Sequence, residues 1–161
     1  MSAHPTFALV RIDSLHEHEE IVEQKVRKLV TEIASHGVFY DPIWVDRDSG
    51  VILNGHHRTA ALRRLGAQRV PAWLVDYDSD AVRLGRWRDG PPISKAEVVD
   101  RARSGRLFPP QTTRHTIADA LPARPTPLAA LGVQRPSPVA GSQARRARSG
   151  RVSGAGSSPP G

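Results

Sequence analysis

Hydrophobic and polar positions along the chain predict strands that alternate with helices. Short apolar runs bounded by turn residues indicate five strands, at 7–12, 43–45, 51–53, 71–77 and 82–87. Apolar residues spaced three and four apart indicate three helices, at 19–36, at 56–65 and from 94 to about 105. The interleaved order predicts an α/β protein.

The stretch from Val51 to Gly66 places a buried strand, a glycine turn and a helix N-terminus in direct succession. Asn54 and Gly55 end the strand, and the helix begins at His56. The first amides of a helix have no partner within it, and the helix dipole there favours negative charge. This arrangement predicts an anion site, for which a phosphate is one candidate.

The position of Arg58 also indicates an anionic partner near this turn. It lies on the same helical stripe as Ala61, Leu62 and Leu65, the apolar face of this helix. A buried guanidinium is costly without an anionic partner. The partner is either a bound phosphate or an internal carboxylate, and in the second case the two histidines before Arg58 are incidental.

Two adjacent acids open the 19–36 helix, and they face different ways. If the helix includes position 19, Glu19 lies on its apolar arc while Glu20 points away. A carboxylate on a buried face is a candidate functional group. The alternative is a first-turn acid that complements the helix dipole, which is the commoner role.

A dense polar segment follows a proline pair at 109–110. Thr112, Thr113, Arg114 and His115 offer two hydroxyls, a guanidinium and an imidazole. Hydroxyl groups beside an arginine suit a phosphate or a carboxylate. Composition alone favours an ordinary polar loop at this position.

The net charge of +7 is concentrated at the C-terminal end of the chain. Residues 121–161 hold six arginines, no acidic residue and seven of the fourteen prolines, and subtracting the six leaves +1 for 1–120. We therefore predict one folded domain at 1–120 and a disordered tail at 121–161, whose removal leaves the domain folded. Such a tail is expected to contact polyanions only non-specifically.

The chain contains no cysteine, which excludes disulfides, thiolate zinc sites and cysteine nucleophiles. No apolar run approaches the length of a membrane span, and the N-terminus lacks the apolar core of a signal peptide. These features predict a cytoplasmic protein with no membrane partner.

The order of strand, long helix, PIWV, VILNGHHRTAALRRLG and VPAWLVDY resembles the ParB/sulfiredoxin superfamily over roughly 7–90. The resemblance implies a compact α/β (α+β) domain in which helices flank a small mixed sheet. In that superfamily the glycine turn and helix N-terminus hold nucleotide phosphates. The resemblance therefore implies that Gly55, His56, His57 and Arg58 bind the nucleotide phosphates in this chain.

Further segments are most similar to the free L-serine kinases and extend the resemblance to about residue 120. HEHEE at 16–20 resembles the segment that carries their catalytic glutamate, here Glu19. GRWR resembles the segment of their substrate-side tryptophan, here Trp87. SKAEVVDRARSGRLFPPQTTRH resembles their closing helix and substrate motif, here Thr112 to His115.

The chain departs from these kinases at two positions near the expected phosphates. They read Asp-Gly-His-His-Arg where this chain has Asn54, and they have lysine before the two threonines where it has Gln111. They also carry an additional block near the connection 87–94. Asn54 is expected to act at the catalytic centre as a neutral hydrogen-bonding group.

The resemblance implies a phosphotransferase that makes O-phosphoserine from free L-serine, with ATP or ADP as donor. Glu19 would take the proton of the serine hydroxyl as general base. Mg²⁺ would be held mainly by phosphate oxygens and water.

The same superfamily supplies two alternatives. A sulfiredoxin-type reductase needs a cysteine, which this chain lacks. A ParB-type switch usually carries a helix-turn-helix after the nucleotide fold, and the Pro/Arg-rich remainder does not predict one, which argues against specific DNA binding. A non-catalytic nucleotide-binding or regulatory module remains as the alternative to the kinase.

Overall fold

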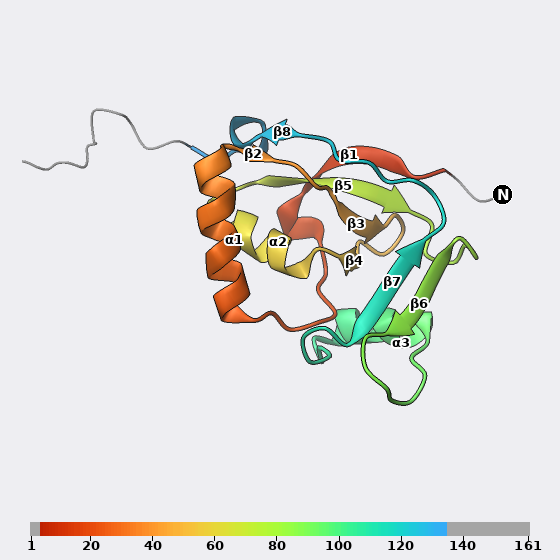
Figure 1. Ribbon diagram of the computed structural model, residues 1–161. Coiled ribbons are helices and arrows are strands. Elements are labelled where there is room, and N and C mark those ends of the chain that lie inside the picture. The colour runs from red at the N-terminus through yellow and green to blue at the C-terminus, as the bar shows by residue number, and fades with distance from the viewer. Residues whose placement is uncertain (1–3, 135–161) are drawn as a thin grey trace, which may run out of the picture.

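The computed structural model describes residues 4–134 (Figure 1). Its helical elements are α1 (Glu23–His36), α2 (His56–Arg64), α3 (Lys95–Ser104) and the 3₁₀ turns η1 (Ile12–Ser14) and η2 (Leu128–Leu131). Its strands are β1 (Thr6–Arg11), β2 (Val38–Phe39), β3 (Ile43–Asp46), β4 (Ile52–Asn54), β5 (Arg69–Val75), β6 (Val82–Arg86), β7 (Thr113–Ile117) and β8 (Thr126–Pro127). The predicted α/β class is confirmed.

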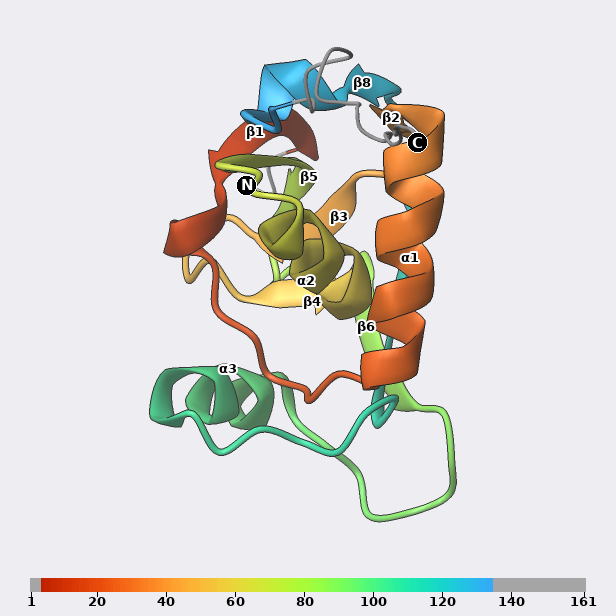
Figure 2. The same ribbon diagram turned by 90° about the vertical axis from the view of Figure 1, so that its left-hand side faces the viewer.

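Four strands form a central mixed sheet in the order β1-β5-β3-β4, in which β3 and β5 are parallel and the other pairs antiparallel. Helices α1 and α2 lie side by side next to this sheet (Figure 2). The antiparallel pair β6–β7 and helix α3 lie together at one end, and the short pair β2–β8 lies at the other (Figure 1). None of the helices between residues 4 and 134 is both long and apolar enough to cross a membrane.

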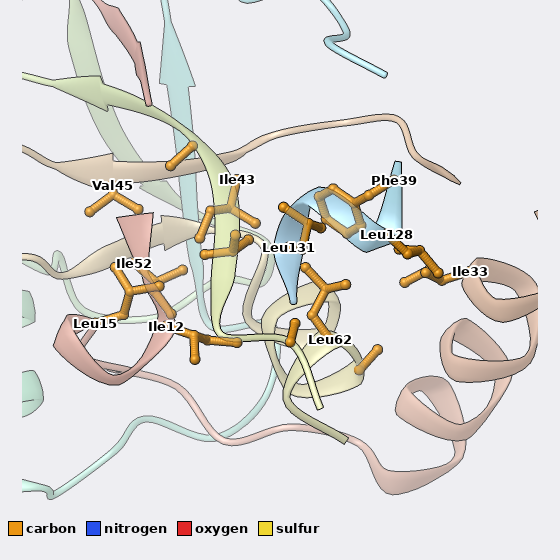
Figure 3. Packing of buried hydrophobic residues seen from close by; sticks show 14 of the residues in the cluster. Ile12, Leu15, Ile33, Phe39, Ile43, Val45, Ile52, Leu62, Leu128 and Leu131 are labelled. Carbon is orange, nitrogen blue, oxygen red and sulfur yellow. The ribbon is translucent and has the colours of Figure 1, made fainter. Parts of the chain in front are cut away.

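Two hydrophobic clusters stabilise this arrangement, and β4 belongs to both. Ile52 packs into the larger cluster, between the sheet and helices α1 and α2 (Figure 3). Val51 and Leu53 pack into the smaller cluster, with residues from α3 and the β5–β6 region. Successive side chains of a strand point to opposite faces, so one short strand serves both. The strand ends at the exposed Asn54, at the junction of the two clusters.

The predicted helix 19–36 begins instead at Glu23, so the helical phasing used for Glu19 is wrong. Glu19 lies in an extended segment, where it forms an isolated bridge with Phe108. Val22 has β-region dihedrals, which suit a β-branched residue. Glu19 is nevertheless 8% exposed, because the chain around it is covered by other elements.

The composition-based interpretation of 112–115 as a polar loop is also wrong. Residues from Thr113 onward form β7, which pairs with β6 in the register Arg86 to Thr113. Thr113 and His115 are buried while Arg114 is exposed, the alternation expected of a strand. The alternation escapes a hydrophobicity pattern because the buried residues are themselves polar.

The predicted domain boundary at 120/121 lies too early in the chain. Leu128 and Leu131 are 7% and 0% exposed and pack beside Ile33 and Phe39 in the larger cluster (Figure 3). Strand β8 pairs with β2. Overall composition hides these few well-placed apolar residues among prolines and arginines. The rest of the predicted tail, 135–161, lies outside the described residues.

Candidate functional site

A cavity of about 180 Å³ opens where the end of β4, the start of α2, the extended segment before α1 and strand β7 meet. Most residues that line it are those predicted from the sequence: Glu19, Asn54, Gly55, His56, His57, Trp87, Thr113, Arg114 and His115. Leu53 and Gln111 complete the lining. Residues far apart in the sequence therefore meet at one site.

The turn into α2 accepts only glycine. Gly55 has φ 113°, and a Cβ built there would lie 2.4 Å from Cγ2 of Ile43. A side chain would therefore be both strained and in collision with the sheet. Among residues 4–134 no side chain caps this end of α2, which leaves its first-turn amides available to a ligand at the cavity.

His56 and His57 tie the Glu19 segment to α2. Nε2 of His56 accepts a hydrogen bond from the backbone N–H of His18 at 3.2 Å, and Nε2 of His57 accepts one from Val22 at 3.0 Å. Burial lowers the pKa of both rings. A neutral ring that accepts at Nε2 carries its hydrogen on Nδ1, which remains a donor. The two rings thus bind the backbone on either side of Glu19.

The Glu19 carboxylate accepts hydrogen bonds from the segment that leads into β7. Its Oε1 accepts the backbone N–H of Gln111 at 3.1 Å, and its Oε2 accepts that of Thr113 at 2.7 Å. The Thr113 hydroxyl also donates to Oε2. Gln111 has φ 56°, the one positive φ outside glycine in 4–134. This turn directs two amides at one carboxylate and fixes its orientation.

Trp87 and Arg114 form the outer wall of the cavity. Trp87 is 58% exposed, and the Arg114 guanidinium lies over its ring at 4.7 Å from the centroid. The pair offers a flat aromatic face and a positive charge to a ligand. Thr112 does not line the cavity, because its hydroxyl donates to the carbonyl of Pro109 at 2.7 Å.

Arg58 lies beneath the glycine turn and does not line the cavity. Its Nη2 donates to the carbonyl of Pro42 at 3.2 Å. Burial lowers its pKa, and the nearby charge of Asp41 acts in the opposite direction. Within the described chain, Nε of Arg58 has no hydrogen-bond partner and no carboxylate lies within ion-pair distance. The internal salt bridge considered from the sequence is therefore absent there.

The sequence pattern did not single out two buried residues behind the cavity, His18 and Tyr77. His18 is 0% exposed, and its Nε2 lies 2.8 Å from Oγ1 of Thr113. The Tyr77 hydroxyl lies 2.8 Å from Nε2 of His115, and burial raises the pKa of Tyr77. The sequence signal for this buried polar cluster was the two-residue spacing of Thr113 and His115, the partners of His18 and Tyr77. On a strand that spacing places both side chains on one face.

Because three histidines are buried, we expect the free energy of unfolding to fall as the pH is lowered. Burial lowers the pKa of His18, His56 and His115, to about 3 for His115. After unfolding each ring regains a pKa near 6.5 and binds a proton, so stability present above pH 6.5 is lost as the pH falls. We expect the free energy of unfolding to drop by up to about 1.4 kcal/mol per pH unit for each histidine.

Urea denaturation at several pH values between 7 and 5 measures this dependence. The variant His115→Gln removes one of the three titrating groups and should show a shallower decline than the parent protein. Identical slopes in the two proteins would contradict the assignment of His115 as a neutral ring in the folded state.

Comparisons with known proteins place the chain beside enzymes that phosphorylate serine. No family model matches it. An ADP-dependent L-serine kinase of Thermococcus kodakarensis is 30% identical over 101 residues, 60% of this chain and 42% of that protein. An ATP-dependent L-serine kinase of Staphylothermus marinus is 40% identical over 83 residues, which are 49% of this chain and 33% of that protein. The chain spans about two fifths or less of the length of these relatives.

A solved structure shares the fold. A free serine kinase in complex with ADP superposes with a TM-score of 0.71 at 17% sequence identity, over 78% of this chain and 93% of that one. The predicted resemblance to the free L-serine kinases and the predicted fold are therefore confirmed.

Proposed function

We propose that this protein transfers a phosphoryl group from ATP or ADP to the hydroxyl of free L-serine, forming O-phosphoserine. The observation that carries the proposal is the oriented Glu19 carboxylate in the same cavity as the uncapped N-terminus of α2. The first element suits a base and the second suits phosphates, which are the two parts that such a reaction needs. The similarity to L-serine kinases supports this interpretation.

The donor phosphates would bind at the start of α2. The backbone amides of His56 and His57 follow the glycine turn, where the helix dipole stabilises negative charge. The Nδ1–H groups of these histidines are further donors. Arg58 Nη2 lies 3.1 Å from the position a Cβ of Gly55 would take, so its positive charge lies directly beneath the turn.

The acceptor serine would lie between Glu19 and the wall formed by Trp87 and Arg114. Glu19 removes the hydroxyl proton as the serine oxygen attacks the terminal phosphorus of the nucleotide. The bond from that phosphorus to its bridging oxygen breaks, and the nucleotide leaves with one phosphoryl group fewer. Arg114 and the Thr113–His115 strand would orient the serine and the transferred group.

The residues present fit Mg²⁺ that arrives with the nucleotide. In the part of the chain that the structure describes, no cluster of three histidine or acidic side chains could hold a metal ion. Phosphate oxygens and water would therefore supply most of the ligands, as Mg²⁺ prefers, with Asn54 at the rim offering one neutral oxygen. The ion would neutralise charge on the transferring phosphoryl group.

Asn54→Asp is expected to lower the Mg²⁺ concentration that gives half-maximal turnover by about two- to fivefold, because an exposed charge pair contributes roughly 0.4–1 kcal/mol. The added carboxylate also repels the donor, but a divalent cation outweighs one negative charge. A magnesium titration of turnover measures the change. The neutral variant Asn54→Ser should not lower the requirement. A higher requirement in Asn54→Asp would show that asparagine suits this site better than a carboxylate.

Incubation with L-serine, Mg²⁺ and either ATP or ADP tests the proposed reaction directly. Mass spectrometry should detect O-phosphoserine with at least one donor, and the Glu19→Gln protein purified in the same way should not produce it. Nucleotide binding without product from either donor would contradict the kinase and favour a non-catalytic nucleotide-binding module.

A further inference from the structure

The hydroxyl of Thr113 lies between two polar groups that cannot both receive its hydrogen. Its Oγ1 is hydrogen-bonded to Oε2 of Glu19 and lies 2.8 Å from Nε2 of His18. A threonine hydroxyl donates once and accepts through its lone pairs. His18 is 0% exposed and does not line the cavity, so water does not substitute for Thr113 as the partner of its Nε2.

The direction of these hydrogen bonds follows from Glu19. Both oxygens of the Glu19 carboxylate accept backbone N–H groups and act as acceptors, so the Thr113 hydroxyl donates to Oε2. The hydroxyl oxygen is then free to accept, and Nε2 of His18 must carry a hydrogen and donate it. Nδ1 of His18 is then the unprotonated nitrogen, and within the described residues it has no hydrogen-bond partner.

We propose that His18 is a positioning residue, which through its Nε2–H holds the hydroxyl hydrogen of Thr113 on Glu19 and so orients the base. The kinetic part of this inference rests on the proposed function, whereas the hydrogen-bond direction does not. His18 touches neither substrate, since it is completely buried behind the cavity and does not line it.

The surroundings of His18 favour a neutral ring. Its ring packs edge-on against His56, His115 and Phe108, at centroid distances of 4.5, 5.7 and 6.3 Å. Burial lowers the pKa of His18 more than the charge of Glu19 raises it, and it lowers the pKa of both neighbouring histidines. The opposite tautomer would leave the Thr113 hydrogen on His18 and turn two acceptors toward one another at Glu19.

The tautomer can be measured without any substrate. Correlation of the ring nitrogens with the ring carbon-bound hydrogens by NMR, on the unliganded ¹⁵N-labelled protein at neutral pH, should report the Nε2–H form for His18. The spectrum of Thr113→Val assigns the signal, because that change removes the acceptor of Nε2. An Nδ1–H tautomer for His18 in the parent protein would overturn the proposal.

Kinetics test the positioning role. His18→Leu should lower kcat by about 10- to 100-fold, the value of the Thr113–Glu19 hydrogen bond that His18 orients, while the KM for nucleotide changes little. His18→Gln places an amide N–H near the position of Nε2 and should recover most of the loss. In a Thr113→Val background, His18→Leu should cause no further loss, because its partner is already gone.

Equal losses in His18→Leu and His18→Gln, or additive losses with Thr113→Val, would overturn the positioning role. Thermal denaturation of each variant separates these outcomes from misfolding. If the parent protein forms no O-phosphoserine, the proposed function fails, and the NMR measurement alone decides whether His18 directs the Thr113 hydrogen.

Discussion

Glu19→Gln is expected to reduce O-phosphoserine formation by about 10²- to 10⁴-fold, the usual contribution of a general base. The substitution keeps the shape of the side chain but replaces one accepting oxygen with an N–H₂ group. That group must face either the Gln111 amide or the donors of Thr113, because the carboxylate accepts from both. The variant therefore loses the base and also places a donor against a donor.

Nucleotide affinity should change little in Glu19→Gln, because the proposed phosphate site is at the start of α2. Single-turnover kinetics and calorimetry measure the two quantities separately. Glu20→Gln is the matched control, since Glu20 is the adjacent acid and is exposed. A larger loss in Glu20→Gln than in Glu19→Gln would show that Glu20, and not Glu19, is the base.

Ending the chain after Leu121 is expected to destabilise the fold by at least about 3 kcal/mol, because each buried leucine side chain contributes roughly 2–5 kcal/mol. The change removes Leu128 and Leu131 from the larger cluster and removes the strand that pairs with β2. It also removes the Arg124 guanidinium, which lies over the ring of Trp73 at 5.1 Å. A loss of this size is a large fraction of the stability of an ordinary domain.

Chemical denaturation compares this shortened chain with one that ends after Gln134. The longer variant keeps every contact that the structure describes and should unfold at the same denaturant concentration as the parent. Leu131→Ala in the full chain should account for a substantial part of the loss. Equal midpoints for the two shortened chains would restore the boundary at 120/121 that composition predicts.

The sequence pattern identified the elements whose burial follows hydrophobicity. Helix α2, with its glycine turn, and strand β5 lie close to their predicted positions, because apolar spacing alone specifies them. The predicted start of α3 at 94 agrees with its N-cap, where the Ser94 hydroxyl accepts the backbone N–H of Glu97 at 3.1 Å.

The features that pattern analysis missed depend on polar groups that are buried together. Strand β7 alternates buried Thr113 and His115 with exposed residues, so its periodicity does not appear in hydrophobicity. Glu19 was singled out for a helical position that it does not occupy, and it is buried through contacts with a segment some 90 residues away in the sequence. Such long-range contacts have no local signature.

The two histidines at the start of α2 have a mechanical consequence for the proposed reaction. Their rings hold the backbone on either side of Glu19, while their own amides belong to the turn that would receive the phosphates. A displacement of that turn therefore moves the base as well. Occupation of the donor site and of the acceptor site is then thermodynamically linked, and each ligand changes the affinity for the other by the same factor.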